Sequence, residues 1–395
     1  MDFRFSEEEE AFRQEVLDFL KKELTSKGMS VLTLWEGETE EEWEFAREFT
    51  KKLGKKGWLA LWWPREYGGL GGSDVQYLIF NEEMAYYRAP RVDVAGTGII
   101  GPTIMVHGTE EQKKRFLVPT ARGEIIWCQG YTEPGAGSDS AAIQTRAVDD
   151  GDDYIINGQK VFTSLAHHSD YCYLTTRTDP NAPKHKGLSY FLVDLKSPGI
   201  TMRPLINMLG AHSFNEIYLD EVRVPKANML GKKNEAWKIM MATLNFERGT
   251  LASMAGQARR ALDELIACAK EMRHNGQPLA QDPMVRHKLA ELAIEVQVAR
   301  LLTYRVIWMQ GKRLFPSYEA SLAKTFGDEL NFRIARIGMD ILGLYGQLAK
   351  GSKWAPLAGW TASAYQGTLG SLFAGGTPEI QRNVISNIGL GLPRR

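Results

Sequence analysis

Cysteine is scarce in this sequence: Cys128, Cys172 and Cys268 are the three among 395 residues. They are too few and too scattered for a disulfide framework or a zinc site, so we expect reduced thiols and no metal. No apolar run reaches the roughly 18 residues that a membrane-spanning helix needs, and the acidic N-terminus does not resemble a signal peptide. We therefore expect a soluble, cytoplasmic protein without membrane contacts.

The formal net charge is zero, because 48 Lys and Arg residues balance 48 Asp and Glu residues. Without long basic blocks, the chain offers no electrostatic reason to bind nucleic acid or an anionic membrane. Its length exceeds that of a usual single core, so we expect two or three subdomains.

The first part of the chain, residues 1–127, has mainly helical patterns. Ser6 and Glu9 have the spacing of a capping box, and apolar residues then recur on one helical face. Further helices are expected at 42–53, from Asp74 onward, at 94–107 and after Thr109. These patterns predict an N-terminal helical domain.

Alternating patterns follow in residues 128–233, and long helical patterns return in 234–395. Asn157-Gly158 is a strong hairpin signal within the alternating part, which predicts a small antiparallel sheet or barrel. The last part predicts helices at 237–274, 284–310 and 318–344 and a short one from Pro378, with a less regular stretch at 346–370. The predicted fold class is α+β, mainly α: a helical domain, an antiparallel β-domain and a C-terminal four-helix bundle.

Residues 128–139 form a glycine-rich stretch, CQGYTEPGAGSD, where the period changes from helical to alternating. Gly, Pro, Ser and Asp dominate surface turns for local reasons, so composition alone favours an ordinary turn. The same residues could cradle a phosphate or a flat polar ring, because the glycines admit a close backbone approach and the hydroxyl groups can hydrogen-bond.

The order of the residues in this stretch resembles the flavin-binding signature of the acyl-CoA dehydrogenase family. Further segments resemble that family's motifs in the same order along nearly the whole chain: WPREYGG at 63–69, HGTEEQK at 107–113, NGQK at 157–160, VRVP at 222–225 and GTPEIQR at 376–382. The nearest resemblance is to the bacterial branch with pimeloyl-CoA dehydrogenase large subunits and steroid side-chain dehydrogenases.

Such membership implies FAD-dependent α,β-dehydrogenation of an acyl-CoA thioester to the 2-enoyl-CoA, with electrons leaving to an electron-transfer flavoprotein. The branch often acts on dicarboxylic, branched or cyclic acyl groups, and the sequence does not choose among these and straight chains.

The reaction needs a carboxylate that removes the α-proton of the thioester. Many members carry it directly before the Gly-Thr of the closing motif, where this chain has Gly375. The isovaleryl and long-chain branches place it before an arginine on the first long helix of the bundle, and Glu247-Arg248 matches that pattern. The resemblance thus implies Glu247 as the base, with Arg248 supporting it at the substrate. By itself Glu247 would read as a solvated helix carboxylate and Arg248 as a surface arginine.

The resemblance also assigns flavin and thioester contacts. Tyr131 and Thr132 are expected to approach the flavin ring through backbone and hydroxyl groups, and Ser138 to lie near the pyrophosphate and the pantetheine. Ser164 stands where a hydroxyl bonds flavin N5. Phe162 replaces the usual tryptophan against the ring, although a role in the sheet core is equally open. The thioester carbonyl is expected to meet a backbone N–H near Gly375 or Gly376.

A second subunit completes each FAD site in this family. The residues expected to serve the neighbouring site are Arg273, Gly343, Gly346, Thr377 and Glu379. Asp340 stands where glutamine is common, so a carboxylate would face the diphosphate. Such departures leave open a homo-oligomer, dimer or tetramer, and an α2β2 heterotetramer with a related chain.

Three alternatives remain at this point. The chain could be a silent partner subunit that only lends FAD contacts, although Glu247 argues against this. It could be an acyl-CoA oxidase or a nitrogen monooxygenase of the same fold, distinguished by how fast the reduced flavin reacts with oxygen. A DNA-associated relative should have a basic C-terminal surface, which the neutral charge balance disfavours.

Overall fold

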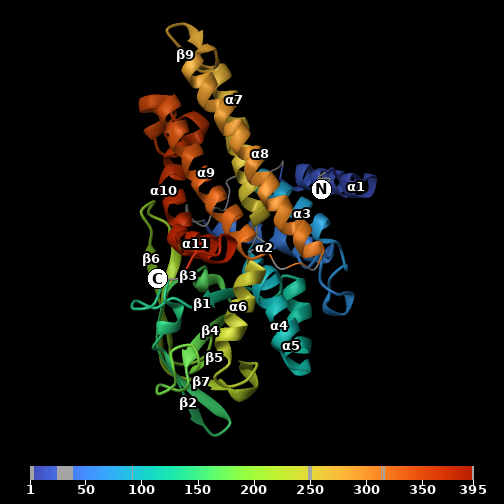
Figure 1. Ribbon diagram of the computed structural model, residues 1–395, viewed down its shortest axis with the longest axis vertical. Helices are drawn as coiled ribbons and strands as arrows, with labels where there is room; N and C mark the ends of the chain where they lie inside the picture. Colours follow the sequence, from blue (N-terminus) through green and yellow to red (C-terminus); the bar gives the residue numbers. More distant parts are fainter. Residues whose placement is uncertain are drawn as a thin grey trace. The chain divides into compact units, whose positions relative to one another are not determined.

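The computed structural model describes residues 4–24, 39–90, 92–247, 251–312, 314 and 316–393. Its internal contacts divide the chain into two compact units (Figure 1). The first, here the bundle unit, comprises Met1–Val31, Ser73–Ala89 and Thr250–Arg395. The second, the sheet unit, comprises Leu32–Gly72 and Pro90–Gly249. The three-domain division expected from the sequence remains a prediction.

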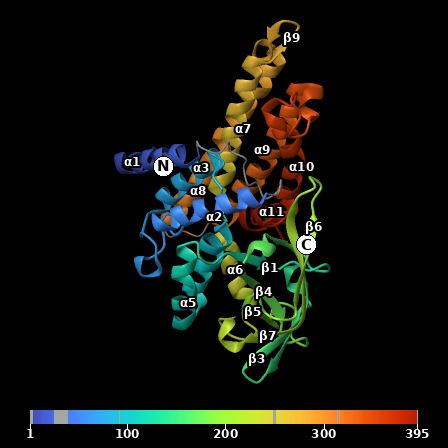
Figure 2. The same ribbon diagram turned by 180° about the vertical axis from the view of Figure 1, so that it is seen from behind.

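Long helices that pack side by side make up most of the bundle unit, as both views show (Figures 1 and 2). A short hairpin of β9 (Arg273–His274) and β10 (Gln277–Pro278) joins α7 to α8 at one end of the bundle. The helices are α1 (Glu7–Leu24), α3 (Asp74–Tyr86), α7 (Leu251–Glu271), α8 (Pro283–Gly311), α9 (Tyr318–Leu342), α10 (Trp360–Phe373) and α11 (Pro378–Val384).

A largely antiparallel sheet with strand order β6-β7-β3-β2-β4-β5-β8 forms the centre of the sheet unit. β1 adds to β4 in parallel, which departs from the expected all-antiparallel arrangement. The strands are β1 (Trp127–Gly130), β2 (Arg146–Asp150), β3 (Asp153–Ser164), β4 (Tyr171–Arg177), β5 (Leu188–Asp194), β6 (Ile200–Ile206), β7 (His212–Pro225) and β8 (Met229–Leu230). The helices are α2 (Glu40–Lys55), the π-helical η2 (Val94–Ile100), α4 (Gly101–His107), α5 (Glu110–Ala121) and α6 (Ala236–Glu247).

Capping boxes fix where several of these helices begin. At α1 the predicted box is confirmed, because the Ser6 N–H donates to the Glu9 carboxylate at 2.7 Å and the Glu9 N–H donates to Ser6 Oγ at 3.2 Å. Each such pair satisfies two N–H groups that the first helical turn leaves without partners. The same reciprocal pattern occurs at Thr39 with Glu42, at Ser73 with Gln76 and at Thr109 with Gln112.

The expected hairpin at Asn157-Gly158 is wrong. β3 runs through both residues without turning back, and the chain reverses instead around Gly151, between β2 and β3. Gly158 marks an irregularity in the pairing of β3 with β7. A Cβ on Gly158 would lie 2.5 Å from Thr145 Oγ1 and 2.7 Å from Thr145 Cα, so glycine serves close strand approach here rather than a turn.

The helical pattern predicted for 237–274 corresponds to two elements, α6 and α7, and residues 248–250 between them lie outside the described residues. Part of the stretch 346–370, expected to be irregular, forms α10. Its sequence is rich in Ala, Gly and Thr and has no clear polar face, so the period of 3.6 that identifies an amphipathic helix is missing. Among the helices of the described ranges, none is long and apolar enough to cross a membrane.

A continuous apolar core lies between the sheet and α4, α5 and α6 in the sheet unit. Trp63, Tyr173 and Tyr190 are its largest fully buried side chains. α6 contributes Ile239 and Met240, both at most 2% exposed. This packing fixes how α6 lies against the sheet, which matters because Glu247 is its last residue.

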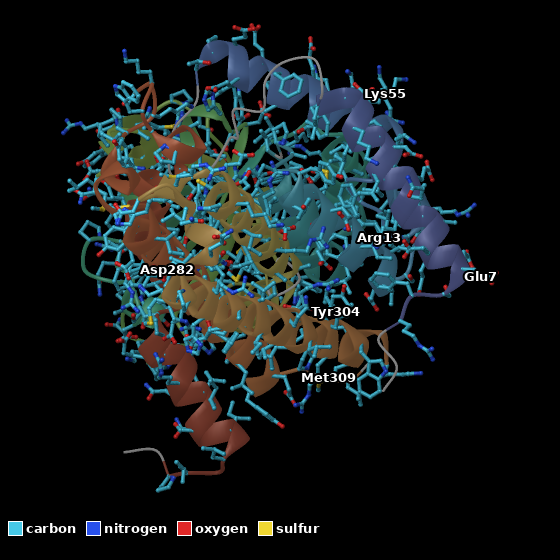
Figure 3. All side chains as sticks on the ribbon, turned by 90° about the horizontal axis from the view of Figure 1, so that it is seen from above. Glu7, Arg13, Lys55, Asp282, Tyr304 and Met309 are labelled. Atoms are coloured by element: carbon cyan, nitrogen blue, oxygen red, sulfur yellow. The ribbon has the colours of Figure 1, made fainter. Side chains whose placement is uncertain are left out.

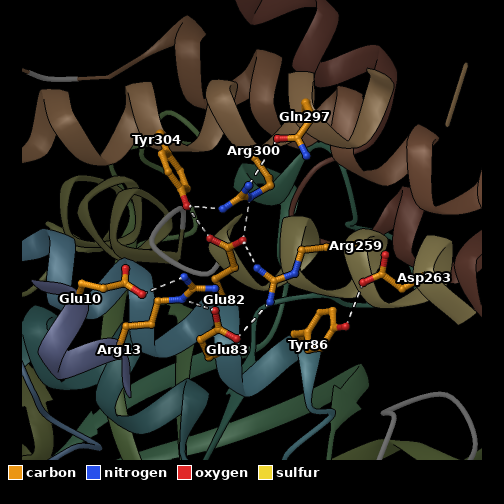
Figure 4. Close-up of polar contacts among 10 residues, drawn as sticks. All are labelled: Glu10, Arg13, Glu82, Glu83, Tyr86, Arg259, Asp263, Gln297, Arg300 and Tyr304. Atoms are coloured by element: carbon orange, nitrogen blue, oxygen red, sulfur yellow. Dashed lines mark hydrogen bonds and ion pairs between the residues drawn. The ribbon is translucent and has the colours of Figure 1, made fainter. Parts of the chain in front are cut away.

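Two adjacent glutamates of α3 are buried in the bundle unit (Figure 4). Glu82 and Glu83 are 3% and 2% exposed. Arg259 reaches both carboxylates at 3.0 Å, and Arg300 contacts Glu82 at 2.8 Å. Because each buried charge has an opposite charge within hydrogen-bonding distance, the group links α3 to α7 and α8 without leaving a lone ion in the interior.

Two further contacts extend this buried group to α1 and along α8. Arg13 donates to Glu83 at 2.8 Å, and the Tyr304 hydroxyl donates to Glu82 at 2.7 Å. Figure 3 shows Arg13 on α1 and Tyr304 on α8, between Asp282 and Met309. Burial, followed by the nearby charge of Glu82, raises the pKa of Tyr304 far above its ordinary value. Its phenol therefore stays protonated and keeps donating to Glu82.

Candidate active site

The glycine-rich loop follows β1 directly and begins under tight packing. A Cβ on Gly130 would lie 2.8 Å from Cys172 Sγ, so the close pairing of β1 with β4 requires a residue without a side chain. Further along, Gly135 and Gly137 would place a Cβ with nothing within 4 Å. Packing within the chain therefore does not explain these two glycines.

Tyr131 and Thr132 lie at the start of this loop, and Ser138 is exposed near its end. The Tyr131 side chain points into the core, where its hydroxyl oxygen lies 2.7 Å from that of Tyr190. Because its hydroxyl is engaged in the core, Tyr131 can face a ligand only with its backbone. The sequence had predicted a flavin contact through both backbone and hydroxyl groups. The Thr132 carbonyl accepts from the Val161 N–H at 2.9 Å, so the loop is held against β3.

Phe162 and Ser164 occupy the end of β3. Phe162 is 62% exposed and has a φ of 56°, a left-handed conformation that is rare for a large side chain. Its ring meets Phe214 edge-on at 6.3 Å, and Ser164 pairs with Phe214 in the sheet. An exposed aromatic ring on strained backbone, beside a hydroxyl, fits a flat and partly apolar ring system such as a flavin.

A buried ion pair behind this loop was not predicted. Lys160 is fully buried, and its Nζ lies 2.7 Å from a Glu133 carboxylate oxygen. Burial lowers the pKa of Lys160, an effect that the Glu133 charge opposes. For Glu133, burial acts to raise the pKa, but Lys160 and N–H donors outweigh it and bring the value below the ordinary one. Lysine is seldom buried, so only its position on the inward-facing side of β3 could have signalled this role.

Glu247 ends α6 and is half-buried. One turn earlier, Thr243 donates to the Ile239 carbonyl at 2.9 Å and accepts from the Thr103 hydroxyl at 3.2 Å, which fixes this end of the helix against α4. Burial raises the pKa of Tyr173 well above its ordinary value, and the charge of Glu247 adds to the effect. Glu247 is therefore within electrostatic reach of the tyrosine core. Arg248 lies outside the described residues.

The remaining predicted residues belong to the bundle unit. Gly375 and Gly376 have φ values of 61° and 95° directly before α11, and Thr377 caps that helix by accepting the Ile380 N–H at 3.3 Å. Glu379 is exposed in the first turn, where backbone N–H groups and then the Thr377 hydroxyl lower its pKa. These residues form one local cluster around the start of α11.

Arg273 is not part of that cluster. It lies in the β9–β10 hairpin, which both views place at the far end of α7 from α11, and it donates to the Gly276 carbonyl at 3.1 Å (Figures 1 and 2). Gly343 follows α9 with a φ of 55°, and the carbonyl of the buried Gly346 accepts from Thr361 at 2.9 Å. The structure thus places these residues apart from one another within the bundle unit.

Asp340, whose carboxylate was expected to face a diphosphate, has an opposite charge nearby. Lys288 Nζ lies 3.3 Å from its carboxylate on the surface of the bundle unit. Within the described residues, no three His, Cys, Asp or Glu side chains cluster in a way that could hold a metal. An open hollow of about 470 Å³ borders the glycine-rich loop, lined partly by Gly135, Gln144 and Gln159. Neither Ser164 nor Glu247 lines it, so this hollow is not the expected reaction site.

Comparison with known proteins agrees with this geometry. Models of the N-terminal, middle and C-terminal domains of acyl-CoA dehydrogenase match residues 6–124, 128–222 and 234–390. Acyl-CoA dehydrogenase FadE26 of Mycobacterium tuberculosis is 36% identical over 408 residues, covering 100% of this chain and 99% of the relative.

Two solved structures are similar over the whole length of both chains. The Tcur3481-Tcur3483 steroid ACAD has a TM-score of 0.92 at 34% identity, with 100% of each chain covered. The ChsE4-ChsE5 complex from Mycobacterium tuberculosis has a TM-score of 0.89 at 35% identity, again with 100% of each chain covered.

Together, the helical and sheet elements and the glycine-rich loop define a flavin-dependent oxidoreductase. The chain belongs to the acyl-CoA dehydrogenase family, whose members bind FAD. The resemblance inferred from the sequence motifs is thereby confirmed, as are the fold class, the enzyme class and the cofactor.

Proposed function

We propose that this chain oxidises an acyl-CoA thioester to the 2-enoyl-CoA with Glu247 as the catalytic base. The observation that carries the proposal is the position of Glu247, half-buried at the end of α6, the helix that packs on the core of the sheet unit. At the alternative position, Gly375 has no side chain that could take a proton. Partial shielding from water suits a carboxylate that removes a carbon-bound proton.

In this scheme the Glu247 carboxylate takes the α-proton while the β-carbon loses a hydride, so that a carbon–carbon double bond forms. When bound, FAD supplies the hydride acceptor. Backbone N–H groups near Gly375 and Gly376 polarise the thioester carbonyl, which makes the α-proton easier to remove.

Within the sheet unit, Thr132, Phe162 and Ser164 are proposed to hold the isoalloxazine ring, together with the backbone of Tyr131. Ser138 is proposed to contact both the pyrophosphate and the pantetheine, in keeping with its exposed position. Arg248 is proposed to support the base or the substrate. Arg273, Gly343, Gly346, Thr377 and Glu379 are proposed to complete the FAD site of a neighbouring subunit.

The decisive experiment is anaerobic bleaching of the flavin absorbance by a panel of acyl-CoA thioesters. Glu247→Gln removes the base but keeps the size of the side chain, and Glu124→Gln changes an exposed glutamate of the same unit as a matched control. Loss of a general base typically slows a reaction by about 10²- to 10⁴-fold, so Glu247→Gln should bleach slower by that factor with an unchanged FAD content. Glu124→Gln should match the wild type.

Bleaching of Glu247→Gln at the wild-type rate would sink this assignment. If no thioester of the panel bleaches the wild type, the alternative of a partner subunit that lends FAD contacts takes its place. The panel should span straight, branched, dicarboxylic and cyclic acyl groups, including a steroid side chain, because the named relatives include a steroid ACAD.

Electrons are proposed to leave through an electron-transfer flavoprotein rather than to oxygen. Stopped-flow reoxidation distinguishes the two: after reduction by substrate, the flavin should reoxidise much faster with electron-transfer flavoprotein than with air-saturated buffer. Fast reaction with oxygen alone would favour the acyl-CoA oxidase alternative. The cytoplasmic location expected from the sequence stays a prediction.

A heteromeric assembly is the second candidate, because two similar structures, the Tcur3481-Tcur3483 steroid ACAD and the ChsE4-ChsE5 complex, are named as pairs of chains. Light scattering on the purified chain decides between the assemblies. A dimer or tetramer that retains FAD supports a homo-oligomer. A monomer without FAD supports a requirement for a related subunit.

A further inference from the structure

Lys160, which pairs with Glu133, also contacts two backbone carbonyl groups. Lys160 Nζ also lies 2.8 Å from the Thr175 carbonyl and 3.4 Å from the Tyr131 carbonyl. One ammonium group on β3 thus contacts β4, the glycine-rich loop and the Glu133 side chain. All three hydrogen-bonding directions of the ammonium have an acceptor, as a fully buried charge requires.

Glu133 is held equally firmly. Its carboxylate accepts the Gln144 N–H at 2.6 Å and the Thr145 N–H at 3.1 Å, besides the contact with Lys160. Its own backbone exchanges two hydrogen bonds of 3.0 Å with Ala136. The side chain therefore ties the start of the loop to residues 144 and 145 on the way to β2.

A second buried cation holds the returning part of the loop. Arg177 donates to the Ala141 carbonyl at 2.6 Å and to the Ile143 carbonyl at 3.3 Å. Burial lowers the pKa of Arg177, an effect that the charge of Glu133 opposes. Buried cations thus hold the chain at both ends of this segment: Lys160 pairs with Glu133, and Arg177 binds the carbonyls of Ala141 and Ile143.

We infer that Lys160 and Glu133 are positioning residues that fix the Tyr131–Thr132 backbone relative to Phe162 and Ser164 before FAD binds. The reason is one of chain geometry: Lys160 stands two residues before Phe162 on the same strand, and Nζ contacts the carbonyl of Tyr131. The Val161 N–H binds the Thr132 carbonyl between these two sites. This inference rests on the proposed flavin contacts but not on Glu247.

The consequence is an energetic one for FAD binding. A loop that is already in its bound conformation avoids the ordering cost that a flexible loop would add at the moment of binding. Removing the ammonium takes away one of the contacts that hold the loop against β3, so part of the ordering cost would fall on FAD affinity. Chemistry at the thioester would then be affected only through the position of the flavin.

The test measures the dissociation constant for FAD at a temperature where circular dichroism shows the apo-protein to be folded. Lys160→Met removes the ammonium and keeps the length of the side chain. Lys184→Met is the matched control, because Lys184 forms a pair of the same 2.7 Å length with Asp139 at the other end of this loop, but both side chains are about half exposed. Lys160→Met should weaken FAD binding by about tenfold or more, and Lys184→Met by less than about twofold.

The double variant Glu133→Gln/Lys160→Met distinguishes a role in positioning the loop for FAD from a role in protein stability alone. It removes both charges of the Lys160–Glu133 pair, so neither is left unpaired and the resistance to urea should recover toward that of the wild type. FAD affinity should stay low, because the Tyr131 carbonyl has lost its donor. Recovery of FAD affinity in step with stability would overturn the inference. So would wild-type FAD affinity in Lys160→Met.

A measurement on the wild type keeps the inference testable if Lys160→Met does not fold. Hydrogen exchange of the FAD-free protein should show slow exchange at the amides of Glu133, Ala136, Gln144, Thr145 and Val161, all of which donate within the fixed loop. Exchange at the rate of an unstructured segment would contradict a loop fixed in advance. Bleaching of the wild type but not of Glu247→Gln is independent of this outcome, so failure of one idea is distinguishable from failure of the other.

Discussion

The phenol oxygens of Tyr131 and Tyr190 lie 2.7 Å apart in the core of the sheet unit. Burial raises the pKa of both groups well above the ordinary value, so both stay protonated. This contact joins the glycine-rich loop to β5 through side chains. Tyr131 and Tyr190 belong to the same buried cluster as Ile239 and Met240 of α6, so the loop and the helix that carries Glu247 share one core.

Replacement of Tyr190 by phenylalanine should destabilise the protein without disturbing its shape. The Tyr131 hydroxyl would lose a partner in a dry core, which costs about 1 to 3 kcal/mol. Urea unfolding of Tyr190→Phe measures this cost. Tyr171→Phe is the control, because the Tyr171 hydroxyl receives its 3.3 Å bond from Arg115 in an exposed setting, and its loss should cost little. Equal stability of Tyr190→Phe and the wild type would contradict the importance of the contact.

Replacing a buried glutamate of α3 in the bundle unit should lower the free energy of unfolding more than Tyr190→Phe does. Glu82→Gln leaves Arg259 and Arg300 without the charge that they share, and breaking a buried pair typically costs about 3 to 5 kcal/mol. Glu110→Gln is the control: Glu110 forms a surface pair with Lys113 at 2.9 Å and is 69% exposed, so its loss should cost about 0 to 1 kcal/mol. Denaturant midpoints of the two variants should differ accordingly. Similar midpoints would show that the buried group contributes no more than a surface pair.

Several features of fold and site were predictable because local chemistry determines them. The box of Ser6 and Glu9 involves residues only three apart and begins α1, and the glycine-rich stretch lies between a helical and an alternating pattern. Features that depend on distant neighbours were missed. Asn157-Gly158 has turn chemistry, but Thr145 approaches so closely that glycine is needed within a strand.

The same limit applies to the candidate site. A lysine such as Lys160 is expected at the surface, and only the acceptors that β4 and the loop bring to it make its burial possible. The direction of the Tyr131 hydroxyl likewise depends on Tyr190, which lies 59 residues further along the chain. Family motifs assigned residue types to roles, but not the side of the loop that each side chain faces.

Acid should expose the contribution of Glu133 to stability. Its pKa is lower in the folded protein than the ordinary value of 4.5. The stabilisation is therefore fully present above about pH 4.5, and it is lost as the pH falls through the lowered folded value. Unfolding free energies of the wild type and of Glu133→Gln should differ most near neutrality and converge below pH 4.5. Glu124→Gln, altered at an exposed site, should stay parallel to the wild type; a constant gap for Glu133→Gln would mean that its charge is not responsible.

Gly130 and Gly137 allow packing and ligand contact to be told apart within one loop. Gly130→Ala would bring a methyl group within 2.8 Å of Cys172 Sγ, and such overpacking typically costs about 1 to 3 kcal/mol. Gly137→Ala meets no atom of the chain within 4 Å, so its urea midpoint should equal that of the wild type. If the loop receives the flavin pyrophosphate closely, the added methyl group should nevertheless weaken FAD binding. Urea unfolding measures the stability of the two variants, and fluorescence titration measures their affinity for FAD. Unchanged FAD affinity in Gly137→Ala would mean that the ligand does not approach the loop at this glycine.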